Sequence, residues 1–164
     1  MINKTIKHMN ANNAILVFHS LLRWVILFLA AAALFRSYTG WRNKTEYGKQ
    51  DNLVSLFFMI AVDVQLLMGL IMYFFTSDMV KAFRANMAAA MHDSIQRFWV
   101  VEHLFGMLIG ITFIHIGRAV AKKATTDETK HKKQFIFFLI GIIIIIATIP
   151  WPGMAAGRGL LPNF

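Results

Sequence analysis

Four long apolar stretches constrain the fold of this chain more than any other feature of its 164 residues. They run from about Ala14 to Phe35, Leu53 to Phe75, Phe98 to Val120 and Phe135 to Ile149. A helix that crosses the hydrocarbon of a bilayer needs about 20 mostly apolar residues, and its backbone must satisfy its own hydrogen bonds there. The sequence therefore predicts an all-α, integral membrane protein: a four-helix up-down bundle forming a single domain over residues 1–164.

The charged residues support a membrane location. They make up only 15% of the chain, against about a quarter in soluble domains. Lys and Arg outnumber acidic residues 17 to 8, but they gather between the apolar stretches, so we expect the lipid bilayer and no nucleic acid as a partner. The absence of cysteine excludes thiolate-bound clusters and covalently attached haem, yet leaves haem held by histidine.

The distribution of basic residues also predicts the orientation, because cytoplasmic loops are enriched in Lys and Arg. The segments after the first and third stretches hold Arg36, Arg42, Lys44, Lys49, Arg118, Lys122, Lys123, Lys130, Lys132 and Lys133. The opposite side holds Lys4, Lys7, Lys81, Arg84, Arg97 and Arg158. We expect both termini outside the cytoplasm of a bacterial inner membrane. The Ala-rich segment 77–96 predicts a short amphipathic helix at the membrane surface.

Two histidines in the apolar stretches have matching positions. An ionisable side chain inside a span is costly, so it indicates either function or a structural pair. His19 and His103 each follow the start of their stretch by five residues, roughly 8 Å below the same surface. The first and third helices of an up-down bundle face each other across the core. This arrangement suits one b-type haem with His19 and His103 as its iron ligands.

Other residues are expected to surround this haem. Gly106 shares a helical face with His103, and Gly69 matches the depth of the two histidines with Gln65 on its face. Haem propionates would point towards Arg97, Arg84 or Arg158. The expected cofactor-binding set is His19, His103, Gly69, Gly106, Arg23, Gln65 and Arg97. Alternatively, the histidines are hydrogen-bonded packing residues and the glycines serve close helix packing.

The remaining ionisable residues of the spans have several predicted roles. A second haem is not expected, because His115 lies about 120° around the helix from His103 and no histidine matches its depth. Arg23 and Asp63 both lie near the midplane, so their mutual pairing is the economical arrangement. Glu102 and Asp63 are candidate proton acceptors. His115 is a candidate helix cap, or together with Arg118 a binding site for a quinone head group or a phospholipid, and His131 is expected at the surface.

Short motifs resemble a known group of proteins. They are Phe18-His19-Ser20-Leu21-Leu22-Arg23-Trp24, the pair Glu102-His103, and the tail Ile149-Pro150-Trp151-Pro152 with Gly157-Arg158-Gly159. Together they are similar to small four-span "cytochrome b" proteins of Bacteroidetes-type bacteria, distantly similar to cytochrome b561 and CopD-like membrane proteins. The resemblance implies a haem-b electron-transfer role with His19 and His103 as axial ligands. The chain departs from the dihaem pattern because it lacks a second aligned histidine pair.

These observations predict a membrane-bound b-type cytochrome that transfers electrons between quinol and an extracytoplasmic acceptor. An electron carrier is favoured over a self-contained enzyme, with quinol oxidation as the possible chemistry. The expected partners are quinone and other membrane subunits or further copies of the chain. Two alternatives stay open: a non-haem accessory or scaffold subunit, and a small metal or solute transporter that uses Asp63 and His115.

Overall fold

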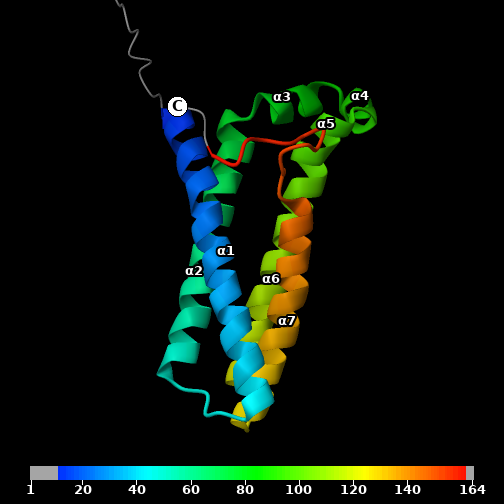
Figure 1. Cartoon of the computed structure of the whole chain (residues 1–164). Coiled ribbons are helices and arrows are strands. Elements are labelled where there is room, and N and C mark those ends of the chain that lie inside the picture. Colours follow the sequence, from blue (N-terminus) through cyan, green and yellow to red (C-terminus); the bar gives the residue numbers. More distant parts are fainter. Residues whose placement is uncertain (1–10, 162–164) are drawn as a thin grey trace, which may run out of the picture.

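Four long helices form the protein (Figure 1). The structure, a computed structural model, describes residues 11–161 and the side chains of residues 14–161; Lys4 and Lys7 lie outside this range. The long helices are α1 (Ala11–Asn43), α2 (Lys49–Ile71), α6 (His103–Lys122) and α7 (Asp127–Thr148). A π-helical turn, η1 (Met72–Thr76), extends α2, and another, η2 (Phe98–Glu102), precedes α6. The described residues contain no strand, which confirms the all-α prediction.

All four predicted spans are present as helices long and apolar enough to cross a membrane. They cover Ala14–Asn43, Lys49–Thr76, Ser94–Lys122 and Asp127–Thr148. All four extend beyond the predicted apolar stretches, and two do so by several residues at one end: α1 continues past Phe35 to Asn43, and α7 begins at Asp127 rather than near Phe135. The earlier start of α7 has a local cause, since the Thr126 hydroxyl accepts from the backbone of Thr129 and acidic residues fill the first turn. Hydropathy alone could not predict such polar turns.

The long helices pack around a common core. α1 contacts α2 and α7, and α6 contacts the same two helices, so α1 and α6 lie diagonally across the bundle. α6 and α7 approach closely because glycines face each other: a Cβ added to Gly141 would lie 2.7 Å from the carbonyl oxygen of Gly110. α7 ends at Thr148, shortly before Pro150, whose ring cannot continue a helix.

The segment between the second and third spans differs from the single helix expected for residues 77–96. It forms three short helices, α3 (Asp78–Ala85), α4 (Met87–His92) and α5 (Ser94–Arg97). The side chains of Ser77, Asn86 and Asp93 accept hydrogen bonds from the backbone at the three starts. Such residues favour helix caps over helix interiors, which is why the segment breaks at Asn86 and Asp93.

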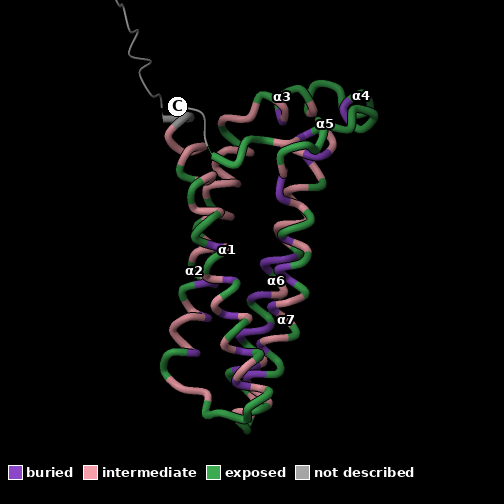
Figure 2. The backbone as a smooth tube through the Cα atoms, in the orientation of Figure 1, coloured by how far each residue is buried: buried purple, intermediate pink, exposed green. Residues whose placement is uncertain are grey.

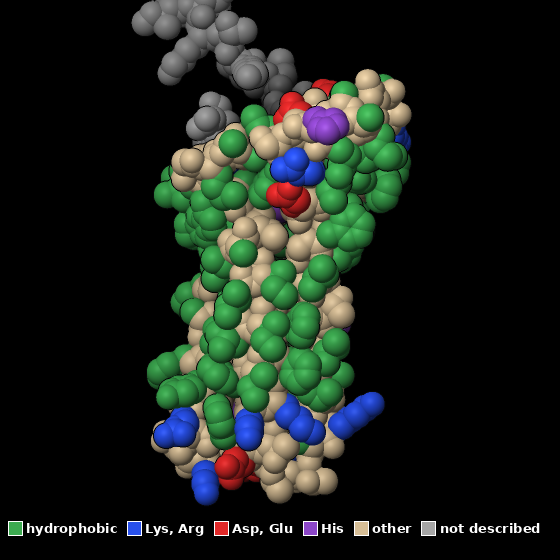
Figure 3. Space-filling model, turned by 90° about the vertical axis from the view of Figure 1, so that its right-hand side faces the viewer, with side chains coloured by type: hydrophobic (Ala, Val, Ile, Leu, Met, Phe, Trp, Pro, Cys, Tyr) green, Lys and Arg blue, Asp and Glu red, His purple; other side chains and the backbone are tan. Residues whose placement is uncertain are grey.

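The two ends of the bundle differ in packing. At the end with the α1–α2 and α6–α7 loops, called the loop end, the helix pairs converge; towards α3, α4 and α5 they separate (Figure 1). Buried residues concentrate in the loop-end half (Figure 2), around Phe58, Ile114 and Phe138. Figure 3 shows a hydrophobic belt above Lys and Arg side chains at the loop end. The opposite end, called the cavity end, contains a large cavity.

Candidate functional site

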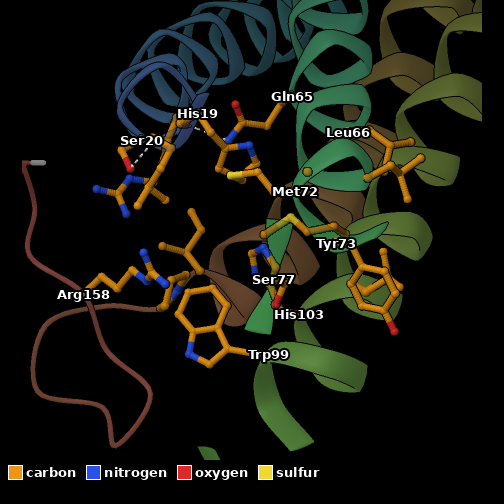
Figure 4. A pocket seen from close by; sticks show the side chains of 18 of the residues that line it. His19, Ser20, Gln65, Leu66, Met72, Tyr73, Ser77, Trp99, His103 and Arg158 are labelled. Atoms are coloured by element: carbon orange, nitrogen blue, oxygen red, sulfur yellow. Dashed lines mark hydrogen bonds between the residues drawn. The ribbon is translucent and has the colours of Figure 1, made fainter. Parts of the chain in front are cut away.

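A cavity of about 500 Å³ opens between the helix pairs at the cavity end. Figure 4 shows His19 of α1 and His103 of α6 beside it, with Gln65 of α2, Trp99 of η2 and Arg158 of the C-terminal segment. Most of the remaining lining is apolar, and the volume falls within the 300–1,000 Å³ usual for small-molecule sites. The two histidines that the sequence pairs by depth thus line one cavity from diagonal helices.

The end of α7 orients the His103 ring. Its Nδ1 lies 2.8 Å from the carbonyl oxygen of Thr148. A carbonyl oxygen only accepts hydrogen bonds, so Nδ1 carries the hydrogen and donates it, and Nε2 keeps its lone pair. The ring also lies close to Trp99 and Phe98, with centroid distances of 5.5 and 6.0 Å. His103 is therefore held in a single tautomer with Nε2 available as a ligand atom.

His19 lies among residues of α2. The amide of Gln65 donates to the backbone carbonyl of His19 over 3.0 Å, which ties α1 to α2 at this level. A Cβ added to Gly69 would lie 3.4 Å from Cε1 of His19, so this glycine leaves the ring close against the α2 backbone. Nδ1 of His19 and Oε1 of Gln65 are buried and have no hydrogen-bond partner within the described part of the chain. Buried polar atoms without partners are uncommon, and these two belong to residues that line the cavity, so a bound group could contact them.

Two guanidinium groups make the outer part of the cavity basic. Arg23 donates from Nη2 to the carbonyl oxygen of Leu160 over 2.8 Å, and Trp24 donates to the same oxygen over 3.0 Å. The Arg158 guanidinium lies 4.6 Å from the centre of the Trp99 ring, and both arginines line the cavity. The expected Arg23–Asp63 pair is therefore wrong, because the C-terminal segment folds back over α1 and supplies the partner of Arg23.

Two residues of the expected cofactor-binding set lie outside the cavity lining. Gly106 faces α7, where an added Cβ would overlap the Thr148 side chain, so this glycine permits close helix packing. Arg97 donates to Glu102 over 2.8 Å and to the carbonyl oxygen of Met91 over 3.0 Å. Both bonds hold the Arg97 side chain near the start of η2, outside the cavity lining. The lining retains His19, His103, Gly69, Gln65 and Arg23 of the set.

Asp63 and His115 form a pair away from the cavity. Oδ1 of Asp63 lies 2.7 Å from Nε2 of His115, and the two side chains are 41% and 45% exposed. Neither residue lines the cavity. His115 is therefore not a helix cap, and the partner of Asp63 lies on α6 rather than on α1.

A buried polar network joins the four helices at the loop end, and the sequence analysis missed it. Arg118 donates to the Ser55 hydroxyl, to the carbonyl oxygen of Asn52 over 3.0 Å and to its side-chain oxygen over 2.9 Å. Gln134 donates to Ser37 over 2.6 Å and accepts from the Tyr47 hydroxyl over 2.7 Å. In the sequence, this polar network is indicated by the isolated polar residues Ser37, Ser55 and Gln134, which lie in or close to the apolar stretches.

Tyr47 belongs to this network, and His131 packs beside it with no hydrogen-bond partner for its ring nitrogens in the described part of the chain. Burial raises the pKa of the Tyr47 hydroxyl above its usual value, which keeps it protonated as a donor. His131, expected at the surface, is buried with its ring 4.9 Å from that of Tyr47. Gly40 makes room for it, since a Cβ there would overlap the imidazole. The loop end is thus a packed polar scaffold rather than a site with space for a ligand.

Comparison with protein-family models, curated proteins and solved structures finds no match. The side chains that line the cavity are therefore the evidence for what it binds. Within residues 11–161, no three or more His, Asp or Glu side chains are grouped to hold a bare metal ion. A haem iron is different, because the porphyrin supplies four nitrogen ligands and the protein needs to supply only one or two. Two imidazoles beside an apolar cavity, with two arginines at its outer part, fit that requirement.

Proposed function

We propose that this protein is a membrane-bound b-type cytochrome that holds one haem b between His19 and His103. The observation that carries the proposal is the presence of both imidazoles on one largely apolar cavity of about 500 Å³. The carbonyl of Thr148 orients His103 as outer-sphere partners commonly orient ligating histidines. The unpartnered Nδ1 of His19 marks a second imidazole whose hydrogen bonding the chain leaves incomplete.

The other lining residues suit the same cofactor. Gly69 gives His19 space against α2, and Gln65 fixes the backbone at His19. Arg23 and Arg158 supply positive charge for two propionate carboxylates, with Asp78 as the one acidic residue of the lining. When bound, a haem b supplies a one-electron redox centre, and the nearby guanidinium groups favour its reduced form.

The proposed physiological role is electron transfer between quinol in the bilayer and an extracytoplasmic acceptor, with the chain acting as a subunit of a larger assembly. The cavity lies at the end opposite the concentration of Lys and Arg (Figure 3). Because basic residues favour the cytoplasmic side, this distribution supports an orientation with the cavity near the outer surface of a bacterial inner membrane and both termini outside. A redox centre there is within reach of an extracytoplasmic partner.

The test is the absorption spectrum of the purified protein and of four single variants. We expect a Soret band and a reducible α-band in the wild-type protein, and the loss of both in His19→Ala and in His103→Ala. The matched controls His92→Ala, in exposed α4, and His115→Ala, outside the cavity, should keep them. Far-ultraviolet circular dichroism and gel filtration check that each variant folds. A low-spin spectrum retained in either ligand variant would contradict the pairing.

The same samples separate the alternatives. A wild-type protein without haem bands would favour the accessory or transporter function over the cytochrome. The hydrogen bond between Asp63 and His115 is the observation that favours a transporter. Loss of metal uptake in Asp63→Asn, in a protein without haem bands, would support it.

A further inference from the structure

Two prolines determine which backbone groups are paired at the end of α7, beside the cavity. In an α-helix each carbonyl accepts a hydrogen bond from the N–H four residues later, and proline has no N–H. The fourth residue after Ile146 is Pro150. The fourth residue after Thr148 is Pro152. The last turn of α7 therefore contains two carbonyl groups that a continued helix would leave without a donor.

The same prolines stop the helix. A residue that precedes proline is driven out of the α region, and Ile149, which precedes Pro150, is extended with φ -70° and ψ 133°. The N–H of Trp151 donates to the carbonyl oxygen of Ile149 over 2.9 Å instead of continuing the helical pattern. The N–H of Arg158 donates to the carbonyl oxygen of Pro150 over 3.1 Å, which ties the following residues back to this turn.

Aromatic side chains supply the donors that the backbone lacks. The indole Nε1 of Trp151 donates to the carbonyl oxygen of Ile146 over 2.8 Å, beside a longer bond of 3.4 Å from the N–H of Ile149. Nδ1 of His103 donates to the carbonyl oxygen of Thr148 over 2.8 Å. Each carbonyl whose helical partner would be a proline is thus matched with an aromatic N–H, and one of these belongs to the cavity.

Close helix packing brings the free carbonyl within reach of the imidazole. Gly106 lies about one turn after His103 on α6, and a Cβ there would overlap the Thr148 side chain. The Thr148 hydroxyl donates to the carbonyl oxygen of Ile144 over 2.9 Å, so it bonds within its own helix rather than to the imidazole. The glycine sets the approach of the helices, and the prolines leave the carbonyl as the acceptor.

We propose that Pro150 and Pro152 are positioning residues for His103. By withholding two backbone N–H groups, they leave the Thr148 carbonyl to keep the hydrogen on Nδ1 and the lone pair on Nε2. The consequence for ligation rests on the proposed haem function, whereas the tautomer of the ring does not. A hydrogen bond of this kind makes a ligating imidazole more basic, which favours the oxidised form of a bound haem iron.

Nitrogen nuclear magnetic resonance of the full chain in detergent tests the proposal, with isotope-labelled histidines and without haem. The His103 signals are those lost in His103→Ala, and in the wild-type protein we expect an exchange-protected hydrogen on Nδ1. Pro150→Ala combined with Pro152→Ala lets α7 continue, so the N–H at position 152 takes the Thr148 carbonyl and the protected signal is lost. Each single proline variant should keep the signal, because the remaining proline still keeps a backbone N–H from this carbonyl.

Trp151→Phe is the matched control within the same turn. It removes the indole donor to Ile146 but leaves both prolines, so the Nδ1 hydrogen of His103 should stay protected. Retention of the signal in the folded double variant, or its loss in Trp151→Phe, would overturn the proposal. A wild-type protein with the hydrogen on Nε2 would overturn it even if the double variant does not fold.

The reduction potential of the haem-loaded proteins is a second readout. The double proline variant should have a higher potential than the wild-type protein, and Trp151→Phe should have one close to wild type. An unchanged potential in the double variant would contradict the effect on ligation. If the wild-type protein binds no haem, the proposed function fails, and the nitrogen spectra still decide the role of the prolines.

Discussion

The two ends of the bundle differ in how closely side chains pack around their buried polar groups. At the loop end, Arg118, Ser55 and Gln134 find partners on other helices of the same chain, whereas the two ring nitrogens of the buried His131 have no hydrogen-bond partner within the described residues. At the cavity end, polar atoms of His19, Arg23 and Gln65 are likewise buried without a partner among the described residues. The difference between the ends is therefore the space beside these groups: His131 packs against Gly40 and Tyr47, whereas His19, Arg23 and Gln65 line a cavity of about 500 Å³. A bound group can supply the missing partners only where there is room for it, which is at the cavity end.

This contrast predicts that core truncation has the largest effect on stability at the loop end. Phe138 is completely buried there, against Phe58 and Ile114. Phe138→Ala should lower the free energy of unfolding by about 3–5 kcal/mol, because a cavity replaces the ring. Leu66→Ala, whose side chain already lines the cavity, should cost only about 1 kcal/mol. Unfolding by sodium dodecyl sulfate titration from mild detergent measures both, and equal losses would contradict the contrast.

Glycine-to-alanine substitutions sharpen the comparison. Gly40→Ala forces a methyl group against the buried His131 ring, so it should destabilise the protein by about 1–3 kcal/mol. At Gly69 the new Cβ would lie 3.4 Å from His19, an ordinary contact. Gly69→Ala should keep stability within about 1 kcal/mol of wild type. Its effect should fall on the absorption spectrum instead, since the added methyl group contacts the ring of a proposed ligand. A spectrum changed by Gly40→Ala but not by Gly69→Ala would reverse this assignment.

The smallest expected difference concerns two tyrosines. Tyr47→Phe removes the donor to Gln134 in the loop-end network and should cost about 1–2 kcal/mol. Tyr73→Phe makes the same change at the cavity end, where the hydroxyl donates to the carbonyl of Val100, and should cost about 1 kcal/mol or less. The measurement is the same detergent titration.

Tyr47 also predicts a pH dependence. Its pKa is raised in the folded state, so the unfolded chain loses the proton first. The stability that this residue contributes is fully present below pH 10.0 and declines as the pH rises towards the folded pKa. Tyr47→Phe should lack this part of the decline, and an identical decline in both proteins would contradict the assignment.

The sequence predicted the four helices because hydrophobic length is a local property that the membrane enforces. The sequence also predicted that His19 and His103 lie at the same depth, since residue spacing along a helix converts directly into depth. The partners of Arg23 and Asp63 could not be predicted in this way. Arg23 bonds to Leu160, far along the chain, and Asp63 bonds to His115 on α6. Which flanks of two helices meet depends on rotation and packing, which the spacing of single residues leaves open.

Gly106 illustrates the same limit. Its spacing from His103 places it on a shared face, but the face serves two purposes: His103 reaches the carbonyl of Thr148 and the cavity, while Gly106 packs on the Thr148 side chain. His131 shows the converse. A histidine among lysines suggests the surface, yet the extra helical turns of α7 carry it beneath Gly40 and Tyr47.

The most direct test of the central claim is the haem content of the purified protein. The pyridine haemochrome assay, combined with quantitative amino-acid analysis, gives the number of haem b groups per chain. One haem per chain is the predicted result, because His19 and His103 line the same cavity and His115 is hydrogen-bonded to Asp63 outside it. No haem in a folded protein expressed with sufficient haem supply, or two haems per chain, would contradict the account.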